Sequence, residues 1–168
     1  MTTSSIYFHN VSNAKITLPP NTLNMGDIQN SVLKHLQEKL EGKCSKDGYI
    51  KKNSIEIIKK SLGKFEIGQF NGNMSYNVEY SAEYCNPVEG SQIECKVISI
   101  NKIGVLSIVS DPDNQPIKVL IPRHTHLNNE DFSNIVVGNR LLVEVIGKRF
   151  ELNESFISVV GKLIQIIN

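Results

Sequence analysis

Side chains that could carry chemistry are few in this sequence and stand far apart. The three cysteines, Cys44, Cys85 and Cys95, do not follow the paired spacing of a zinc site. Their small, odd number favours a reducing compartment over a disulfide scaffold. The sequence has neither a Gly-rich phosphate loop ending in Gly-Lys-Ser/Thr nor a nucleophile elbow. We therefore expect no catalytic residue, no bound metal and no cofactor.

Two short pairs of polar residues could suggest a site, but each has a simpler interpretation. His124 and His126 are two residues apart and would share one face of a strand. Structural zinc takes four ligands, and no further ligands accompany this pair, so we expect loop histidines. Asp111 and Asp113 flank a proline, which is more typical of a turn than of paired catalytic carboxylates.

Basic side chains in the second half of the chain are the remaining candidates for binding. The net charge is only +1, so a nucleic-acid site would have to be a local patch. Such groups contact phosphates without reading the base sequence, although ordinary solvated side chains remain the alternative. The candidates are Lys102, Lys118, Arg123, His124, Lys148 and Arg149. This half has few aromatic residues for base stacking, so we expect weak, sequence-tolerant RNA contact.

The elements that must position these residues begin with a strand and a helix. Short apolar stretches over 6–16 predict a strand, which Pro19-Pro20 ends. Asn24 is a candidate helix cap, with Asp27 in the first turn and Gly42 as the stop. The apolar residues recur at helical spacing and predict a helix that packs on its own sheet. They are Met25, Ile28, Val32, Leu33, Leu36 and Leu40.

A strictly alternating strand follows at 76–84. Its tyrosines and small apolar residues alternate with polar ones, which predicts one face toward a core and one toward water. Between the helix and this strand we expect a hairpin or two short strands, at 43–50 and 54–60. Three glycines within 63–72 predict a loop with a brief strand.

The second half is predicted to be all-β. Five strands are expected at 91–100, 105–109, 117–121, 140–148 and 156–166, separated by Asn, Asp, Pro and Gly turns. Five short strands with a longer connection after the third suit a five-stranded OB-fold barrel. A Pro- and Gly-containing turn at 85–90 is the best candidate boundary, so we expect domains at 1–86 and 87–168.

The 168 residues are enough for one large domain or two small ones. No apolar run approaches the ~18–20 residues that cross a bilayer. The first five residues are polar and uncharged, so we expect no secretory signal.

The order and residues of several segments resemble a known family, the stalk subunit of multi-subunit RNA polymerases. That family includes the seventh subunit of eukaryotic RNA polymerase II and its archaeal counterpart. The matching segments run over most of the chain. They are Ile16-Thr17-Leu18-Pro19-Pro20, Leu40-Glu41-Gly42-Lys43-Cys44, Gly48-Tyr49-Ile50, Tyr76-Asn77-Val78-Glu79-Tyr80-Ser81-Ala82, Pro87-Val88-Glu89-Gly90, Asn101-Lys102-Ile103-Gly104, Ile121-Pro122-Arg123-His124 and Val143-Glu144-Val145-Ile146-Gly147.

The resemblance implies an α+β protein with a truncated ribonucleoprotein-like (RNP-like) tip domain and an S1-like OB barrel. In the family, the tip docks on the polymerase core beside the clamp, and the barrel lies near the RNA exit path. The large subunits hold the catalytic metal, so the resemblance implies a non-catalytic role in initiation and nascent-RNA handling. Carried over to this chain, core docking would fall to the loops containing Leu18, Pro19, Pro20, Gly63, Gly68 and Gly72. RNA contact would fall to Lys102, Arg123, His124, Lys148 and Arg149.

The sequence departs from the family at 125–139, a connection shorter than in the eukaryotic nuclear subunits, and in lacking a C-terminal extension. The family's small helical partner subunit uses such regions, so the resemblance leaves that partner open. The chain has 15 lysines against 3 arginines, with 21 isoleucines and 18 asparagines, which indicates AT-rich codons. Together these features suggest a polymerase encoded by a large DNA virus. They imply a location in the nucleus, or in the virion or a cytoplasmic viral factory.

Two other functions compete with this one. A free-standing S1/OB RNA-binding factor in translation or RNA decay would explain the barrel but leave the first half without a role. A hydrolase or nuclease has no positive support from the residues discussed above.

Overall fold

The computed structural model describes residues 6–22, 26–68, 70–111, 114–126 and 130–167. The chain divides into two compact units. We call Tyr7–Glu41 with Ile50–Tyr84 the sheet unit. The barrel unit contains Gly42–Tyr49 together with the chain from Cys85 onward. The described residues are mainly strand, with two α-helices and two short 3-10 helices among them.

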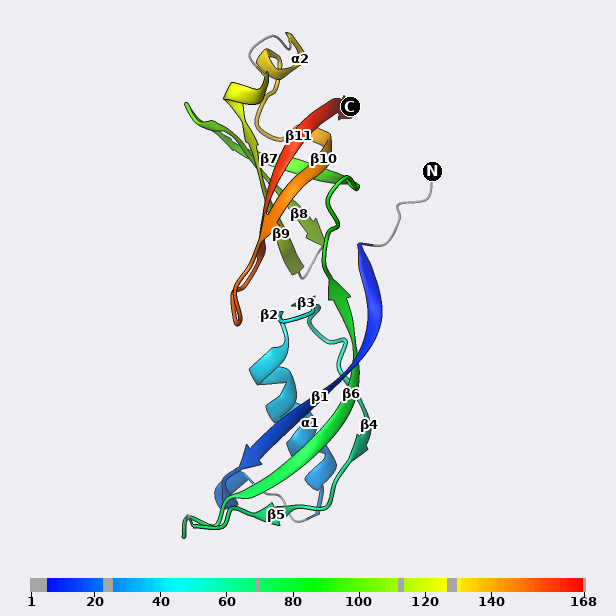
Figure 1. Ribbon diagram of the computed structural model, residues 1–168, viewed down its shortest axis with the longest axis vertical. Coiled ribbons are helices and arrows are strands. Elements are labelled where there is room, and N and C mark those ends of the chain that lie inside the picture. The colour runs from blue at the N-terminus through cyan, green and yellow to red at the C-terminus, as the bar shows by residue number, and fades with distance from the viewer. Residues whose placement is uncertain (1–5, 23–25, 69, 112–113, 127–129, 168) are drawn as a thin grey trace. The chain divides into compact units, whose positions relative to one another are not determined.

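The sheet unit is built around one long strand, β6 (Met74–Cys85). Four strands pair with it: β1 (Tyr7–Leu18), β3 (Gly48–Ile50), β4 (Glu56–Lys60) and β5 (Lys64–Phe65). The helix α1 (Ile28–Leu40) lies against this sheet, and the short 3-10 helix η1 (Pro20–Thr22) follows β1 directly (Figure 1). The predicted stop of the first strand at the proline pair is therefore confirmed.

The core of the sheet unit confirms the alternation predicted for 76–84. The inward residues of β6 are all buried, and Val32 and Leu36 of α1 pack in the same cluster. Ile16 and Leu18 of β1 complete it from the neighbouring strand. The buried set on β6 is Tyr76, Val78, Tyr80, Ala82 and Tyr84.

The helix begins later than the sequence suggested. Its cap is Asp27, whose carboxylate accepts a hydrogen bond from the backbone N–H of Asn30 at 3.1 Å. The predicted cap Asn24 and the apolar Met25 lie outside the described residues. Asp27 takes the capping position because its side chain reaches a free N–H of the first turn. At the other end Gly42 has φ +71°, a conformation that favours glycine, so the predicted stop is confirmed.

Five strands of the barrel unit close into a barrel in the order β10-β11-β9-β8-β7 (Figure 1). The five strands were predicted from the sequence and are confirmed, with ends that differ by no more than three residues. They are β7 (Gln92–Ile100), β8 (Gly104–Asp111), β9 (Asn114–Pro122), β10 (Arg140–Arg149) and β11 (Ile157–Ile167). β11 pairs parallel to β9, and the other barrel pairs are antiparallel. This arrangement is consistent with an OB-like barrel.

The barrel interior is filled by alternate residues of each strand, nearly all of them aliphatic. Gly161 sits where a side chain would not fit, because an added Cβ would lie 2.2 Å from Cγ1 of Val143. Between β9 and β10 the chain forms η2 (Arg123–His126) and the short helix α2 (Glu130–Ser133).

A small hairpin from the first half of the sequence belongs to the barrel unit, except for its last residue, Ile50. It consists of β2 (Cys44–Ser45) and β3 (Gly48–Ile50). The backbone of Cys44 donates to Glu154 O at 2.7 Å and accepts from Asn153 N at 2.8 Å. The hydroxyl of Tyr49 donates to Asn114 Oδ1 at 3.3 Å. Hydrogen bonds thus join residues more than sixty positions apart, which no local pattern in the sequence indicates.

Candidate functional site

Three of the five predicted RNA-contacting residues lie together at one end of the barrel. The turn after β7 is held by Asn101, whose side-chain oxygen accepts from Gly104 N at 3.1 Å. The backbone N–H of Arg123 donates to Ile103 O at 2.9 Å, which ties this turn to the start of η2. The side chains of Lys102, Arg123 and His124 are all exposed. We call these three residues the end cluster.

A hollow of about 280 Å³ lies beside the end cluster. Its lining is mainly apolar, with Arg123 contributing a cation. The lining residues are Ile100, Arg123, His126, Phe132, Ser133 and Ile135.

The two predicted loop histidines have different surroundings. His124 is exposed, whereas the ring of His126 is buried and stacks on Phe132 with 5.0 Å between centroids. Nε2 of His126 accepts from the backbone N–H of Leu163 at 3.0 Å, and Nδ1 lies 2.9 Å from Pro122 O. The carbonyl fixes the proton on Nδ1, so the ring is a structural link between η2 and β11.

The other two predicted RNA-contacting residues lie at the opposite end of the barrel. In the pairing of β10 with β7, Arg140 faces Lys96 and Glu144 faces Gln92. The last residues of β10 therefore extend past the first residue of β7. There Lys148 donates to the backbone carbonyl of Pro87 at 2.8 Å and to the Asn86 side chain.

Arg149 is also engaged by a neighbour in the barrel unit. Its guanidinium pairs with the carboxylate of Glu151 at 2.7 Å. The hydrogen bond and charge of Glu151 raise the pKa of Arg149, which stays cationic. Lys148 and Arg149 thus have internal partners, which weakens their case as phosphate contacts.

The strand register reveals a second group of cations that sequence reasoning did not assemble. Arg140 of β10 is the cross-strand partner of Lys96 on β7, and Lys96 is the partner of Ile108 on β8. Ile108 is in turn the partner of Lys118 on β9. We call Arg140, Lys96, Ile108 and Lys118 the cross-strand row. Lys118 was considered from the sequence, but Lys96 and Arg140 were not, because only the register places them beside it.

The predicted docking loops lie together at one end of the sheet unit. Gly72 is so close to Pro20 that an added Cβ would lie 3.0 Å from its Cγ, and Thr17 donates to Glu66 at 3.1 Å. Pro20 is exposed, Pro19 is half-buried, and Leu18 is only 1% exposed and packs in the core. Leu18 therefore packs beneath this surface and is not exposed on it.

The glycines of the second docking loop have separate roles. Gly63 leaves room for the ring of Tyr76, since an added Cβ would approach that ring to 2.9 Å. Gly68, with φ +97°, and Gly72, with φ +71°, supply conformations that favour glycine in a tight turn. These glycines shape the loop and offer no side chain to a partner.

What this loop does offer is a group of exposed apolar side chains. The exposed fractions are 87% for Leu62, 70% for Phe65, 102% for Ile67 and 108% for Phe70. We call these four residues the apolar loop. From the sequence, only the glycines of this stretch were singled out. The two phenylalanines and the isoleucine among them were the signal that could have found it.

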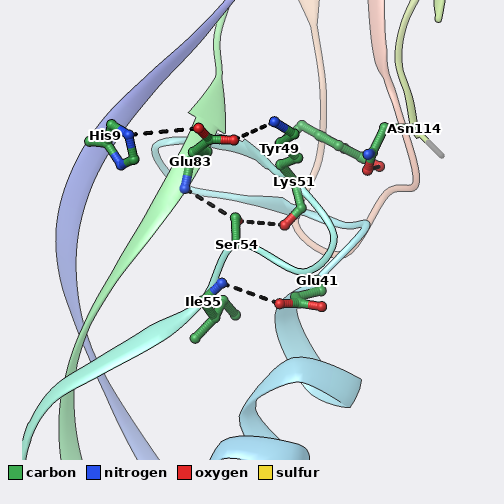
Figure 2. A network of polar contacts seen from close by, with 8 residues as sticks. All are labelled: His9, Glu41, Tyr49, Lys51, Ser54, Ile55, Glu83 and Asn114. Carbon is green, nitrogen blue, oxygen red and sulfur yellow. Dashed lines mark hydrogen bonds and ion pairs between the residues drawn. The ribbon is translucent and has the colours of Figure 1, made fainter. Parts of the chain in front are cut away.

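A polar network in the sheet unit fixes the segment after β3. Lys51 and Glu83 form an ion pair, and His9 Nε2 lies 3.6 Å from the same carboxylate (Figure 2). Ser54 joins the segment after β3 to β6, because its hydroxyl donates to Lys51 O at 2.6 Å and accepts from Glu83 N at 3.2 Å. Glu41 at the end of α1 accepts from Ile55 N at 3.3 Å. The side chains of Ser54 and Glu41 bind backbone groups, and Lys51, His9 and Glu83 contact one another, which indicates a structural role.

The three cysteine side chains are buried, and none of them forms a disulfide bond. Burial raises the pKa of Cys44 and of Cys95 to about 11. A nucleophilic cysteine needs the opposite shift, toward the thiolate. In the part of the chain that the structure describes, no three His, Cys, Asp or Glu side chains are grouped so as to hold a metal ion. The described helices are too short or too polar to cross a bilayer.

The chain is similar to a viral protein along nearly its whole length. The chain is 27% identical over 177 residues to a protein of Acanthamoeba polyphaga mimivirus. That protein is named "Putative DNA-directed RNA polymerase subunit L376", and the match covers 98% of this chain and 85% of the mimivirus protein. The similarity therefore includes both the sheet unit and the barrel unit. No family model matches the chain.

Proposed function

We propose that this chain is a non-catalytic stalk subunit of a DNA-directed RNA polymerase encoded by a large DNA virus. The similarity to the mimivirus polymerase subunit supports this, because it extends over 98% of the chain. The OB-like barrel also supports it, since such barrels bind single-stranded nucleic acid. In this proposal the sheet unit corresponds to the RNP-like tip, and the cell compartment is a viral factory or the nucleus.

The apolar loop is the observation that carries the docking part of the proposal. Four large apolar side chains within nine residues are 70% or more exposed. Exposed apolar clusters of this kind mark protein interfaces in soluble proteins. We assign the apolar loop and Pro20 to a groove on the large polymerase subunits near the clamp. Their burial there would remove the phenylalanine rings from water.

The barrel would then lie near the RNA exit path and handle the nascent transcript. The end cluster supplies two permanent cations and a histidine on exposed turns. Contacts of this kind bind the phosphates of a nucleic acid whatever its base sequence, typically with a Kd of about 10⁻⁴–10⁻⁶ M at physiological salt. Lys148 and Arg149 contribute less because each already has a partner.

Copurification tests the docking assignment. Tagged wild-type protein and the variant Phe65→Ser/Phe70→Ser are coexpressed with the large polymerase subunits of the same genome. We expect the wild type to recover those subunits and the variant to recover roughly tenfold less, because two buried rings are lost. The matched control is Val137→Ser/Leu152→Ser, which removes two exposed apolar side chains of the barrel unit. Wild-type protein that purifies without large subunits under mild conditions would contradict the proposal.

A free-standing RNA-binding factor is the second candidate, and the closed barrel with its exposed cations favours it. Such a factor must bind RNA tightly without a larger assembly. Submicromolar affinity of the purified chain for single-stranded RNA at physiological salt, without recovery of polymerase subunits, would support this function instead.

A further inference from the structure

The ring of His126 is buried, and both of its nitrogen atoms have hydrogen-bond partners. Only 5% of the residue is exposed. Nδ1 lies 2.9 Å from Pro122 O and 2.8 Å from the hydroxyl oxygen of Thr125. That hydroxyl gives its own proton to Pro122 O at 2.9 Å, so its oxygen is left to accept from the ring. Both neighbours of Nδ1 are therefore acceptors, and Nδ1 carries the ring proton.

The second ring nitrogen has to stay without a proton. Nε2 accepts from the backbone N–H of Leu163 on β11 at 3.0 Å. An imidazolium can only donate, so a protonated ring would turn an N–H toward the N–H of Leu163. The hydrogen bond would be lost, and the N–H of Leu163, a buried residue, would be left without its acceptor.

The charged groups around the ring offer an imidazolium no compensation. Arg123 lines the same hollow and would repel a positive charge on His126. In the described part of the chain, no ion pair joins His126 to a carboxylate. On β8 the residue that carries charge is Asp111, at the end of the strand away from η2. Lys118 on β9 is held against Phe156. The charged or titrating side chains on the other surrounding elements are exposed, namely His124 on η2, Glu130 and Asp131 on α2, Lys162 on β11, Glu94 and Lys96 on β7, and Lys102 after β7.

We propose that His126 is a pH-sensitive link, which holds η2 and α2 on the barrel near neutral pH and releases them in acid. A histidine in water gains a proton below about pH 6.5. The released chain then binds a proton that the closed link excludes, so the closed form loses stability as the pH falls below this value. Phe132 stacks on the ring, so α2 is released with it. Arg123 and His124 belong to η2, so release changes the end cluster.

The switch goes beyond the proposed function, because it needs neither a polymerase nor RNA. Hydrogen exchange of the full wild-type chain, followed for single amides by NMR at pH 7.5 and 5.5, tests it directly. The protection factor of the Leu163 amide, which is corrected for the intrinsic exchange rate, should fall roughly tenfold at pH 5.5, one unit below the ordinary histidine pKa.

The amide of Val159 is the internal control for this measurement. Val159 lies on the same strand as Leu163, where it pairs with Lys148 of β10 and Val119 of β9. Its protection should change by less than about twofold, because strand pairing there does not involve the ring. Equal protection of the Leu163 amide at the two pH values would overturn the switch, as would an equal fall at Val159.

Two histidine variants separate this ring from other acid-sensitive groups. His126→Gln removes the titrating ring, and His124→Gln is the matched control, since that side chain is exposed on the same short helix. Between pH 7.5 and 5.5 the thermal midpoint of the wild type should fall by roughly 2–4 °C more than that of His126→Gln. His124→Gln should behave as the wild type does.

The switch is wrong if His126→Gln keeps the full pH dependence of the wild type, or if His124→Gln loses it. If His126→Gln does not fold, the exchange of the Leu163 amide in the wild type decides, since that measurement needs no variant.

Discussion

The sheet unit and the barrel unit present different chemistry to their surroundings. The most exposed apolar side chains of the sheet unit lie in the apolar loop, where Ile67 and Phe70 are fully exposed. The barrel unit has a closed wall on which Lys96, Lys118 and Arg140 share one row. An apolar loop suits a protein groove and a row of cations suits a polyanion. Our proposal that the sheet unit docks and the barrel unit contacts RNA starts from this difference.

The two cores also differ. The core of the sheet unit includes three tyrosines of β6, whose hydroxyls need partners. Tyr84 donates to Ser12 at 3.0 Å, and its oxygen lies 3.4 Å from that of Tyr80. The inward residues of the barrel strands are nearly all aliphatic, which suits a closed interior with few polar partners. The predictions below test this contrast, from the largest expected effect to the smallest.

Removal of a buried aromatic side chain should cause the largest loss of stability. Tyr80→Ala should lower the free energy of unfolding by about 3–5 kcal/mol, since the side chain is buried in the sheet-unit core. Ile117→Val in the barrel core should cost only about 0.5–1.5 kcal/mol. Denaturant unfolding measures both. If Tyr80→Ala keeps wild-type stability, the inward face assigned to β6 is wrong.

A backbone approach in the barrel should make one glycine irreplaceable. Gly104 begins β8, and an added Cβ would lie 2.2 Å from the carbonyl oxygen of Ile121. Gly104→Ala should therefore cost about 1–3 kcal/mol, because backbone cannot move aside as a side chain can. Gly147 has nothing within 4 Å of that position, so Gly147→Ala is the control and should be neutral or mildly stabilising. Equal effects of the two changes would contradict the close approach.

Alkaline pH should weaken the barrel unit, which holds both thiols with a raised pKa. Burial moves the pKa of Cys44 and Cys95 from 9.0 to about 11. Between these values the unfolded chain has released protons that the folded chain still holds, so stability falls as pH rises from 9 to 11. Thermal unfolding at pH 8, 9 and 10 measures the loss. The variant Cys44→Ala/Cys95→Ala should lose less stability over this range. If its pH dependence equals that of the wild type, these thiols do not cause the alkaline loss of stability.

The smallest effects should separate two lysines of the barrel unit. Lys148→Ala removes hydrogen bonds to Asn86 and Pro87 and should cost about 1 kcal/mol. Lys102→Ala should change stability by less than about 0.5 kcal/mol, because the side chain is exposed. Of the two changes, only Lys102→Ala should weaken RNA binding. It should also make the dependence of RNA affinity on salt concentration less steep. The reverse pattern would exchange the structural and RNA-contacting roles of the two lysines.

Local patterns predicted most of the secondary structure. The alternation at 76–84 and the turn residues between the barrel strands identified six strands correctly, because period-two patterns and turn chemistry are local. The helix start was misplaced from Asp27 to Asn24, since both residue types cap helices and only the backbone geometry selects one. The RNP-like identity of the sheet unit and the boundary after residue 86 remain predictions.

The candidate site was only partly accessible from sequence. Lys102, Arg123 and His124 lie at one end of the barrel, because the turn after β7 and the end of β9 meet in a barrel of this order. Their contact with RNA stays a prediction. Lys148 and Arg149 were grouped with them by charge and by resemblance. Their internal partners, Pro87 and Glu151, became visible only in three dimensions.

By itself the sequence determined most of the strands, the presence and the end of the long helix, the five-stranded barrel of the second half, and which side chains are cationic. Only the tertiary structure decided that residues 42–49 belong to the barrel unit and that Lys96, Lys118 and Arg140 stand in one row. Burial alternates along each strand and can be read locally. Register is set jointly by the packing of all strands in the barrel, so a row across four of them exists only once the barrel has closed.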